Sequence, residues 1–378
     1  MRITNYKLRI TICSFVVFIF FANSFSQTNP NFNIFLDGNY SSAEKMLDLY
    51  ERRMGNAEDI ASDKGNMIAL STSLMIEDKW ENGIGLFKEH ISKIKSGEHI
   101  ENDILQLQSS QQRLKEMRDL LEEIKKRNFN RRVVATVEQL FPSNAKIDVN
   151  IPMYIVAFGT EKVDAFVRRI VWENNVPRFV GEGEGELTIV INLSGAVERE
   201  DGLESRFIGV LSTVAHEVFH AAFGNYQDRS KRWKQFRKTH NAPLYQLLEL
   251  VQNEGIAYYF SLEQRGRGYL PRDWNEKTRE AFQKFNLSAE QLLQENISPS
   301  RAFEIIRKAN TSGFWESYGS ISGMVMARAI ETNLGHAALQ ETIAKGVGNF
   351  FEKYSEAIQH DGNLPNVDKE VLEKILEK

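Results

Sequence analysis

Two histidines four residues apart, within an apolar-periodic segment, constrain the fold of this chain more than any other feature. His216 and His220 stand in the run AHEVFH, residues 215–220. Apolar side chains recur around them at helical spacing: Phe207, Val210, Leu211, Val214 and Val218. This period predicts a helix over about 203–223 with one face available for burial. The sequence therefore predicts a core helix that presents both imidazoles on one side.

The spacing of the histidines suits a metal ion. Positions i and i+4 of an α-helix differ by about 40° around the axis, so both imidazoles can reach one Zn²⁺ at about 2.0–2.1 Å. Glu217, one position on, points to the side of such an ion, where it can take a proton from a metal-bound water. We predict His216 and His220 as zinc ligands and Glu217 as the general base. The alternative is a solvated or capped helix face without shared chemistry.

A catalytic zinc site normally has three protein ligands and one open position, so a third ligand is required. Glu254 is the preferred candidate, because it lies in the run VQNEGIA, residues 251–257, inside a second apolar-periodic helix. His240 could ligate from the intervening segment, and Asp228 or Glu249 are further alternatives.

One ligand pattern is excluded by the sequence. The metzincin motif continues from the second histidine as His-x-x-Gly-x-x-His. Here Phe223 occupies the glycine position and Tyr226 the position of the last histidine. A third histidine at metzincin spacing is therefore absent.

The two helices together resemble the gluzincin metallopeptidases, in which an HExxH helix is followed by a helix carrying Asn-Glu-Gly-apolar-Ala. The resemblance covers about residues 187–260 and implies a zincin-like catalytic core with Zn²⁺ held by His216, His220 and Glu254. The 33 residues between His220 and Glu254 exceed the short spacing typical of thermolysin-like members, and an inserted helix would account for them. The pattern is most similar to uncharacterised zinc-dependent peptidase families of exported bacterial proteins.

The rest of the chain predicts an α+β fold, predominantly α, with a small mixed sheet. Residues 41–128 are mostly helix-forming, and strands are expected over 147–158 and 187–193 with an amphipathic helix over 161–173. Later helices are expected over 203–223, 230–239, 243–263, 275–285, 300–309, 320–334 and 337–357. We predict a helical N-terminal region, 27–130, and a metallopeptidase domain, 131–378.

The first residues have the pattern of a secretory signal peptide. Basic residues precede an apolar run and small residues follow it: Arg2, Lys7 and Arg9, then residues 10–21, then Ser24 and Ser26. We predict a signal over 1–26, cleaved before Gln27, and a secreted or periplasmic protein without stable membrane insertion. Cys13, the only cysteine, would leave with the signal, which excludes disulfides and thiolate metal ligands.

Charge gives little reason to expect a nucleic-acid partner. Lys and Arg total 47 against 51 Asp and Glu, for a formal net charge of -4, so no general basic field exists. The expected partner is a peptide or protein substrate, and the oligomeric state is left open. The basic segment 229–240 could recruit an acidic substrate, but we favour a solvated helix that Trp233 and Phe236 dock onto the body.

Two further features have a functional and a structural interpretation. In the resembling peptidases the strand before the HExxH helix is a sheet edge that pairs with extended substrate, so 187–193 is either such an edge or an ordinary internal strand. Those peptidases also often supply a downstream tyrosine or histidine to stabilise the oxyanion. Tyr318 is the candidate for that role, and packing or capping at a helix start is the alternative.

These features together predict an exported zinc-dependent peptidase. A noncatalytic exported protein that binds zinc or another ligand is the rival, and a zinc amidase acting on cell-wall peptides is a further possibility. The position of Glu217 beside two ligands favours hydrolysis, because binding alone needs no general base.

Overall fold

A computed structural model describes residues 29, 31–76, 83–181, 183–240, 242–265, 270, 273–294, 296–310 and 317–376, with side chains omitted for 262–265. The predicted signal peptide, residues 1–26 with Cys13, lies outside the described residues. The predicted class is confirmed, since the structure is mostly helical with one small mixed sheet. The division at residue 130 stays a prediction.

Five strands form the sheet, in the order β1-β2-β5-β3-β4. Their bounds are β1 Phe32–Asn39, β2 Ile147–Val156, β3 Ala165–Glu173, β4 Val176–Phe179 and β5 Glu186–Asn192. β1 pairs with β2, and β2 with β5, in parallel, whereas β3 runs antiparallel to both β5 and β4. β5 is therefore internal, with β2 on one side and β3 on the other. The interpretation of 187–193 as a substrate-pairing edge is wrong, because β5 lies between two other strands and is paired on both sides from Ile189 to Ile191.

Three strands were not expected from the sequence: β1, β3 and β4. The helix predicted over 161–173 is wrong, because residues 165–173 form β3 and pair with β5 along their length. Asn174 and Asn175 both have positive φ, 52° and 64°, as a tight hairpin turn requires, and they lead into β4. β1 lies in the region predicted as helical, and it is fixed by pairing with β2, more than a hundred residues away in the chain.

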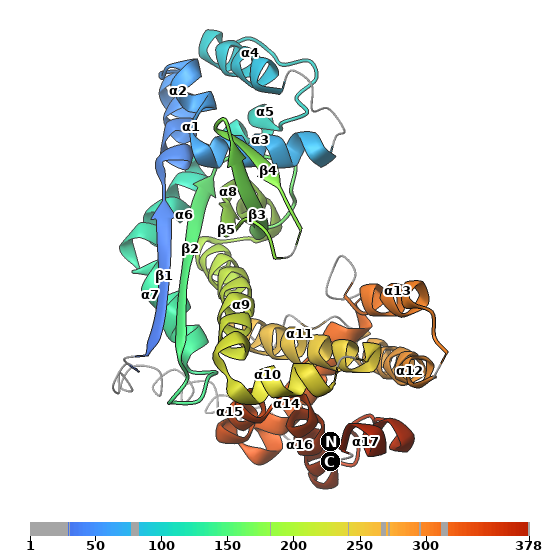
Figure 1. Ribbon diagram of the computed structural model, residues 1–378. Helices are drawn as coiled ribbons and strands as arrows, with labels where there is room; N and C mark the ends of the chain where they lie inside the picture. Colours follow the sequence, from blue (N-terminus) through green and yellow to red (C-terminus); the bar gives the residue numbers. More distant parts are fainter. Residues whose placement is uncertain are drawn as a thin grey trace, which may run out of the picture.

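The N-terminal helices and α8 pack beside the sheet (Figure 1). Their bounds are α1 Ser41–Arg52, α2 Ala57–Ala61, α3 Lys64–Ile76, α4 Gly83–Ser96, α5 Leu107–Gln112, α6 Leu114–Lys126, α7 Phe129–Glu138 and α8 Leu193–Arg199. The remaining helices gather at the other end of the molecule (Figure 1). They are α10 Lys231–Thr239, α11 Pro243–Arg265, α12 Trp274–Leu293, α13 Pro299–Ala309, α14 Tyr318–Leu334, α15 His336–Lys345, α16 Val347–His360 and α17 Lys369–Leu376.

One long helix, α9 Leu203–Arg229, joins the two halves, running from the sheet into the C-terminal helices (Figure 1). Among the described residues it is the one helix long and apolar enough to cross a bilayer, and 67% of its most apolar window is buried in the protein. Phe207, Val214 and Phe219 are each 0% exposed, so its apolar character is used by the core. The predicted core helix is present and is longer than expected.

The helix predicted over 337–357 is divided in the structure. Gly346 has a φ of 93° and separates α15 from α16. Its backbone lies against the ring of Trp233, so the break brings the two helices around a buried aromatic side chain. The apolar periodicity is similar on both sides of the glycine, which is why the sequence pattern alone did not reveal the break.

Candidate metal centre

The two histidines of the HExxH segment are held by the buried face of α9. Val210, Val214 and Val218 are each 0% exposed and fix the rotation of the helix about its axis. His216 is buried and His220 partly exposed, on the side of α9 that faces α11. Their rings lie 4.6 Å apart between centroids, in a T-shaped arrangement.

The position of α11 relative to α9 depends on how closely α11 crosses α14. A Cβ on Gly255 would lie 2.2 Å from the carbonyl carbon of Gly323, and one on Gly323 would lie 1.9 Å from the Val251 carbonyl oxygen. Only glycine permits this approach of the two backbones. Glu254 directly precedes Gly255, so the crossing determines how far the carboxylate reaches toward α9.

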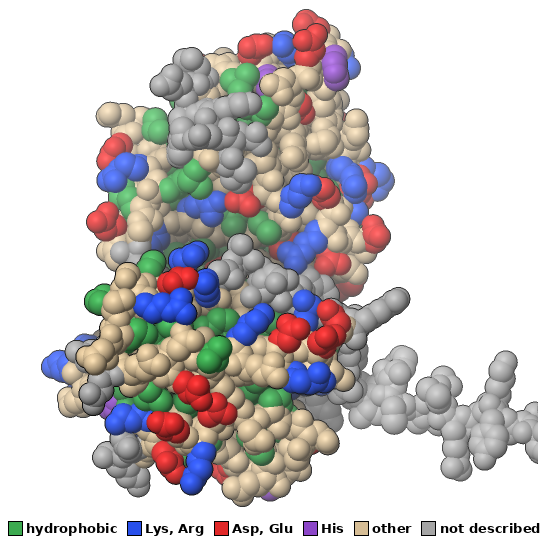
Figure 2. All heavy atoms as spheres, turned by 90° about the vertical axis from the view of Figure 1, so that its right-hand side faces the viewer, with side chains coloured by type: hydrophobic (Ala, Val, Ile, Leu, Met, Phe, Trp, Pro, Cys, Tyr) green, Lys and Arg blue, Asp and Glu red, His purple; other side chains and the backbone are tan. Residues whose placement is uncertain are grey.

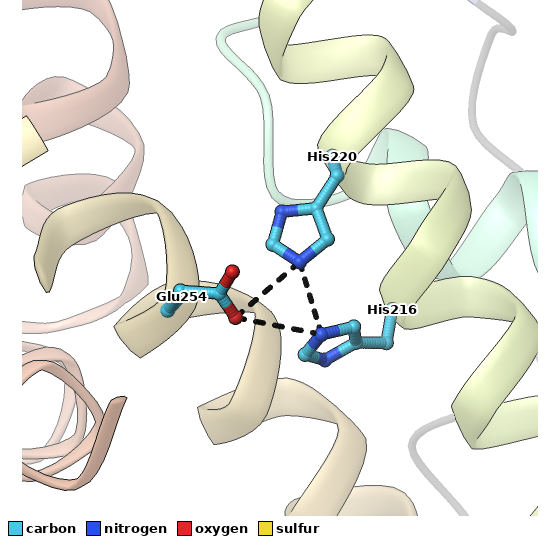
Figure 3. A group of neighbouring side chains, drawn as sticks. All are labelled: His216, His220 and Glu254. Atoms are coloured by element: carbon cyan, nitrogen blue, oxygen red, sulfur yellow. Dashed lines mark hydrogen bonds and ion pairs between the residues drawn. The ribbon is translucent and has the colours of Figure 1, made fainter. Parts of the chain in front are cut away.

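Three ligand atoms converge between α9 and α11 (Figure 3). The Nε2 atoms of His216 and His220 lie 3.0 Å apart, and Glu254 Oε2 lies 3.7 Å from the first and 3.5 Å from the second. A point equidistant from the three atoms is about 2.0 Å from each, which is the length of a zinc bond to imidazole nitrogen or carboxylate oxygen. Two imidazoles and a carboxylate thus fit a zinc ion in both chemistry and spacing.

Two asparagines hold the outer atoms of two of these ligands, His220 and Glu254. The Nδ1 of His220 lies 3.0 Å from Asn253 Oδ1, and because that oxygen can only accept, Nδ1 donates and Nε2 is the ring nitrogen available to a metal ion. The Nδ2 of Asn310 donates to Glu254 Oε1 at 2.8 Å, which leaves Oε2 directed at the histidines. For His220 and Glu254, the converging atom is thus the one that the asparagine does not engage.

The charges of the group are strongly coupled. Burial opposes ionisation of Glu254, but His220, His216 and the Asn310 hydrogen bond outweigh it and lower the pKa of Glu254 to about 2. Burial likewise opposes protonation of His220, but the carboxylates of Glu254 and Glu217 and the bond to Asn253 raise the pKa of His220 to about 9. A buried carboxylate beside two imidazoles attracts positive charge into the site, whether it arrives as protons or as a cation.

Glu217 stands next to the group but does not belong to it. It is half-buried, one residue after His216 on α9. Burial is the main cause of the raised pKa of its carboxyl; the charge of His220 opposes the shift and that of Glu254 adds to it. A carboxylate with a raised pKa is a stronger base, which suits a group that accepts a proton.

The other candidate third ligands lie away from the histidine pair. His240 stacks on Phe236 with 4.6 Å between ring centroids. Glu249 and Asp228 both pair with Arg237, whose Nη1 lies 3.2 Å from Asp228 Oδ1. Among the described residues, the one group of His, Cys, Asp or Glu side chains spaced to hold a metal is His216, His220 and Glu254, whose ligand atoms lie within 4.8 Å of one another.

The Tyr318 hydroxyl makes its hydrogen bond to the backbone of α13. The side chain is buried, and its hydroxyl donates to the Ile305 carbonyl oxygen at 3.1 Å. The single hydroxyl proton is therefore engaged by a backbone carbonyl, and an oxyanion role would require that bond to break. The position favours the packing interpretation.

The inserted helix expected between the two ligand helices is α10. Trp233 is 1% exposed and its Nε1 donates to the Ile343 carbonyl oxygen at 2.9 Å. Phe236 packs against Trp233 with 5.8 Å between ring centroids. The aromatic pair docks a basic helix onto the body, as the favoured interpretation of 229–240 predicted.

Three residues of the site were not identified from the sequence. Asn253 precedes Glu254 in the motif already quoted, so its position was a usable signal. Tyr258, whose ring centroid lies 4.4 Å from that of His216, is four residues after Glu254 and therefore on the same face of α11. Asn310 lies 56 residues from Glu254 and carries no local signal.

Two imidazoles and a carboxylate that converge from two helices form the donor set found in zinc sites. Residues 25–363 match the family described as "Putative zinc dependent peptidase (DUF5700)", and the chain belongs to that family. No curated protein and no solved structure matches the chain.

Proposed function

We propose that the protein is an exported peptidase that uses zinc and the side chains of α9 and α11 to hydrolyse peptide bonds. The observation that carries the proposal is the convergence of His216 Nε2, His220 Nε2 and Glu254 Oε2, with Glu217 adjacent. Membership of a family described as zinc-dependent peptidases supports the same reaction.

Each residue has a stated task in this proposal. His216, His220 and Glu254 hold the ion, while Asn253 and Asn310 keep their ligand atoms aimed at it. A bound zinc supplies Lewis acidity, which lowers the pKa of water to about 7 and polarises a carbonyl. Glu217 accepts a proton from the attacking water and passes it to the nitrogen of the leaving amine. The water oxygen joins the carbonyl carbon as the C–N bond breaks.

Export and substrate are part of the same proposal. The basic-apolar-small pattern of residues 1–26 supports cleavage before Gln27 and a secreted or periplasmic location. The proposed substrate class is a peptide or protein, in line with the description of the family.

The test combines metal analysis with a broad peptide digestion. Purified protein is expected to hold about one zinc per chain and to cleave members of a mixed peptide pool. A chelator should abolish this activity, and added zinc should restore it. Zinc without cleavage of any peptide, cell-wall peptides included, would favour a noncatalytic binding protein. Cleavage confined to cell-wall peptides would favour an amidase, and absence of zinc binding would remove the metal-site proposal.

A further inference from the structure

We infer that Asn310 is a positioning residue that makes Glu254 offer a single oxygen to the ion. The inference rests on the proposed zinc site. Its starting point is the 2.8 Å hydrogen bond from Asn310 Nδ2 to Glu254 Oε1, the oxygen that does not face the histidines. A carboxylate can ligate through one oxygen or through both, and which occurs depends on what else each oxygen contacts.

Asn310 is held in place by the packing of α13. Ala302, Ile305 and Ala309 are buried, with 3%, 4% and 0% exposure, so one face of this helix is fixed against its neighbours. The Tyr318 hydroxyl adds a bond to the Ile305 carbonyl oxygen. Asn310 follows as the C-terminal cap of α13, with a φ of -134° and a ψ of 64° that end the helix, and its amide reaches back to Glu254. An exposed residue is thereby tied to a partly buried ligand.

Single-oxygen ligation matters because a catalytic zinc site keeps a fourth position open. If the second oxygen of Glu254 turned toward the ion, it would compete for that position. Asn310 opposes this rotation, since its amide bonds Oε1 on the far side of the carboxylate. The residue thus acts through Glu254 and need not touch substrate.

The experiment compares Asn310→Leu, which has a similar volume and no donor, with Asn310→Gln, which restores an amide. Asn286→Leu is the matched control, because Asn286 also donates its side-chain amide, in this case to the Asn366 backbone carbonyl oxygen at 3.1 Å, within the same group of helices. Zinc affinity is measured by chelator competition, and the coordination number by visible absorption of the cobalt-substituted protein.

Asn310→Leu is expected to weaken zinc binding about 10- to 100-fold and to reduce the cobalt absorption intensity, as a rise in coordination number does. Asn310→Gln should recover both readouts in part, and Asn286→Leu should change neither. Wild-type affinity and an unaltered cobalt spectrum in Asn310→Leu would overturn the inference.

A parallel Glu254→Ala sample distinguishes a failure of the inference about Asn310 from a failure of the proposed zinc site. If Glu254→Ala loses zinc while Asn310→Leu behaves as wild type, the site stands and the role of Asn310 falls. If Glu254→Ala itself retains full zinc, the third ligand is misassigned, and the inference about Asn310 falls with it.

Discussion

Asn253 Oδ1 accepts a hydrogen bond from His220 Nδ1 at 3.0 Å, so the residue before the acidic ligand fixes the tautomer of a histidine on another helix. Donation from Nδ1 also makes Nε2 a better ligand. The contact joins α9 to α11 directly at the site. It ties the position of Glu254 to that of His220 independently of any bound ion.

Replacement of Asn253 by leucine should therefore weaken zinc binding about 10- to 100-fold, because the acceptor for Nδ1 is lost. Asn253→Asp retains an acceptor oxygen and should bind zinc much closer to wild type. The two dissociation constants, measured by chelator competition, check the prediction. Equal weakening in both variants would mean that the amide acts by packing rather than by orienting the imidazole.

The ligand assignment makes a prediction about metal content. His216→Ala, His220→Ala and Glu254→Ala should each lose most bound zinc, because two remaining ligands form a poor site. His240→Ala should keep about one zinc per chain, since its ring stacks on Phe236 away from the group. Elemental analysis after dialysis provides the measurement. Zinc loss in His240→Ala with retention in Glu254→Ala would transfer the third-ligand role to His240.

The α11–α14 crossing predicts a large steric effect at one glycine. A methyl group at Gly323 would meet the Val251 carbonyl oxygen at 1.9 Å, and backbone cannot yield as a flexible side chain does. Gly323→Ala should lower the free energy of unfolding by about 1–3 kcal/mol, the usual cost of overpacking. Urea denaturation of the zinc-free protein measures it.

Gly224→Ala is the control for that experiment. Gly224 also lies within a helix, α9. Apart from its chain neighbours and the nearby backbone of α9 itself, no atom lies within 4 Å of a Cβ added there. Alanine there should be neutral or stabilising by about 0.5–1 kcal/mol, because it restricts the unfolded chain. A similar loss of stability at both glycines would contradict the steric explanation.

How much of this site was predictable follows from how local each contact is. His216 and His220 are related by one helical turn, and Glu254 stands in a recognisable run, so the three could be found from the sequence. Asn310 could not, because its contact with Glu254 depends on how α13 packs.

The same dependence on distant contacts explains why β3 was predicted as a helix. Its periodicity resembled a helix, and only pairing with β5 decides between the two structures.

A pH-dependent contact joins the C-terminal helices to the end of α7. His336 Nδ1 lies 2.9 Å from Glu331 Oε1, and its Nε2 lies 2.7 Å from the Gln139 carbonyl oxygen. Both neighbours are acceptors, so both ring nitrogens donate only when the imidazole is charged. The hydrogen bond to Glu331 is the main cause of the raised pKa of His336; burial opposes it, and the Gln139 carbonyl adds to it.

Because the folded state holds this proton more tightly, the contribution of His336 to stability is complete below the ordinary histidine pKa of about 6.5. It is lost as the pH rises through the higher folded-state value. His336→Gln should remove that dependence. The difference in urea midpoint between wild type and variant, followed from pH 5.5 to 9, should shrink with rising pH; a constant difference would refute the linkage.

Glu217→Gln separates catalysis from metal binding most directly. The amide is nearly isosteric with the carboxylate, leaves both imidazoles and Glu254 in place, and cannot accept the proton of the attacking water. Zinc content and thermal stability should remain near wild type, whereas peptide hydrolysis should fall by about 10²- to 10⁴-fold, the range for loss of a general base. The comparison requires both proteins loaded with one zinc per chain and a common fluorogenic peptide pool. If the loaded variant hydrolyses the pool as fast as wild type, the proton acceptor is a different group, although the three metal ligands would be unaffected by that result.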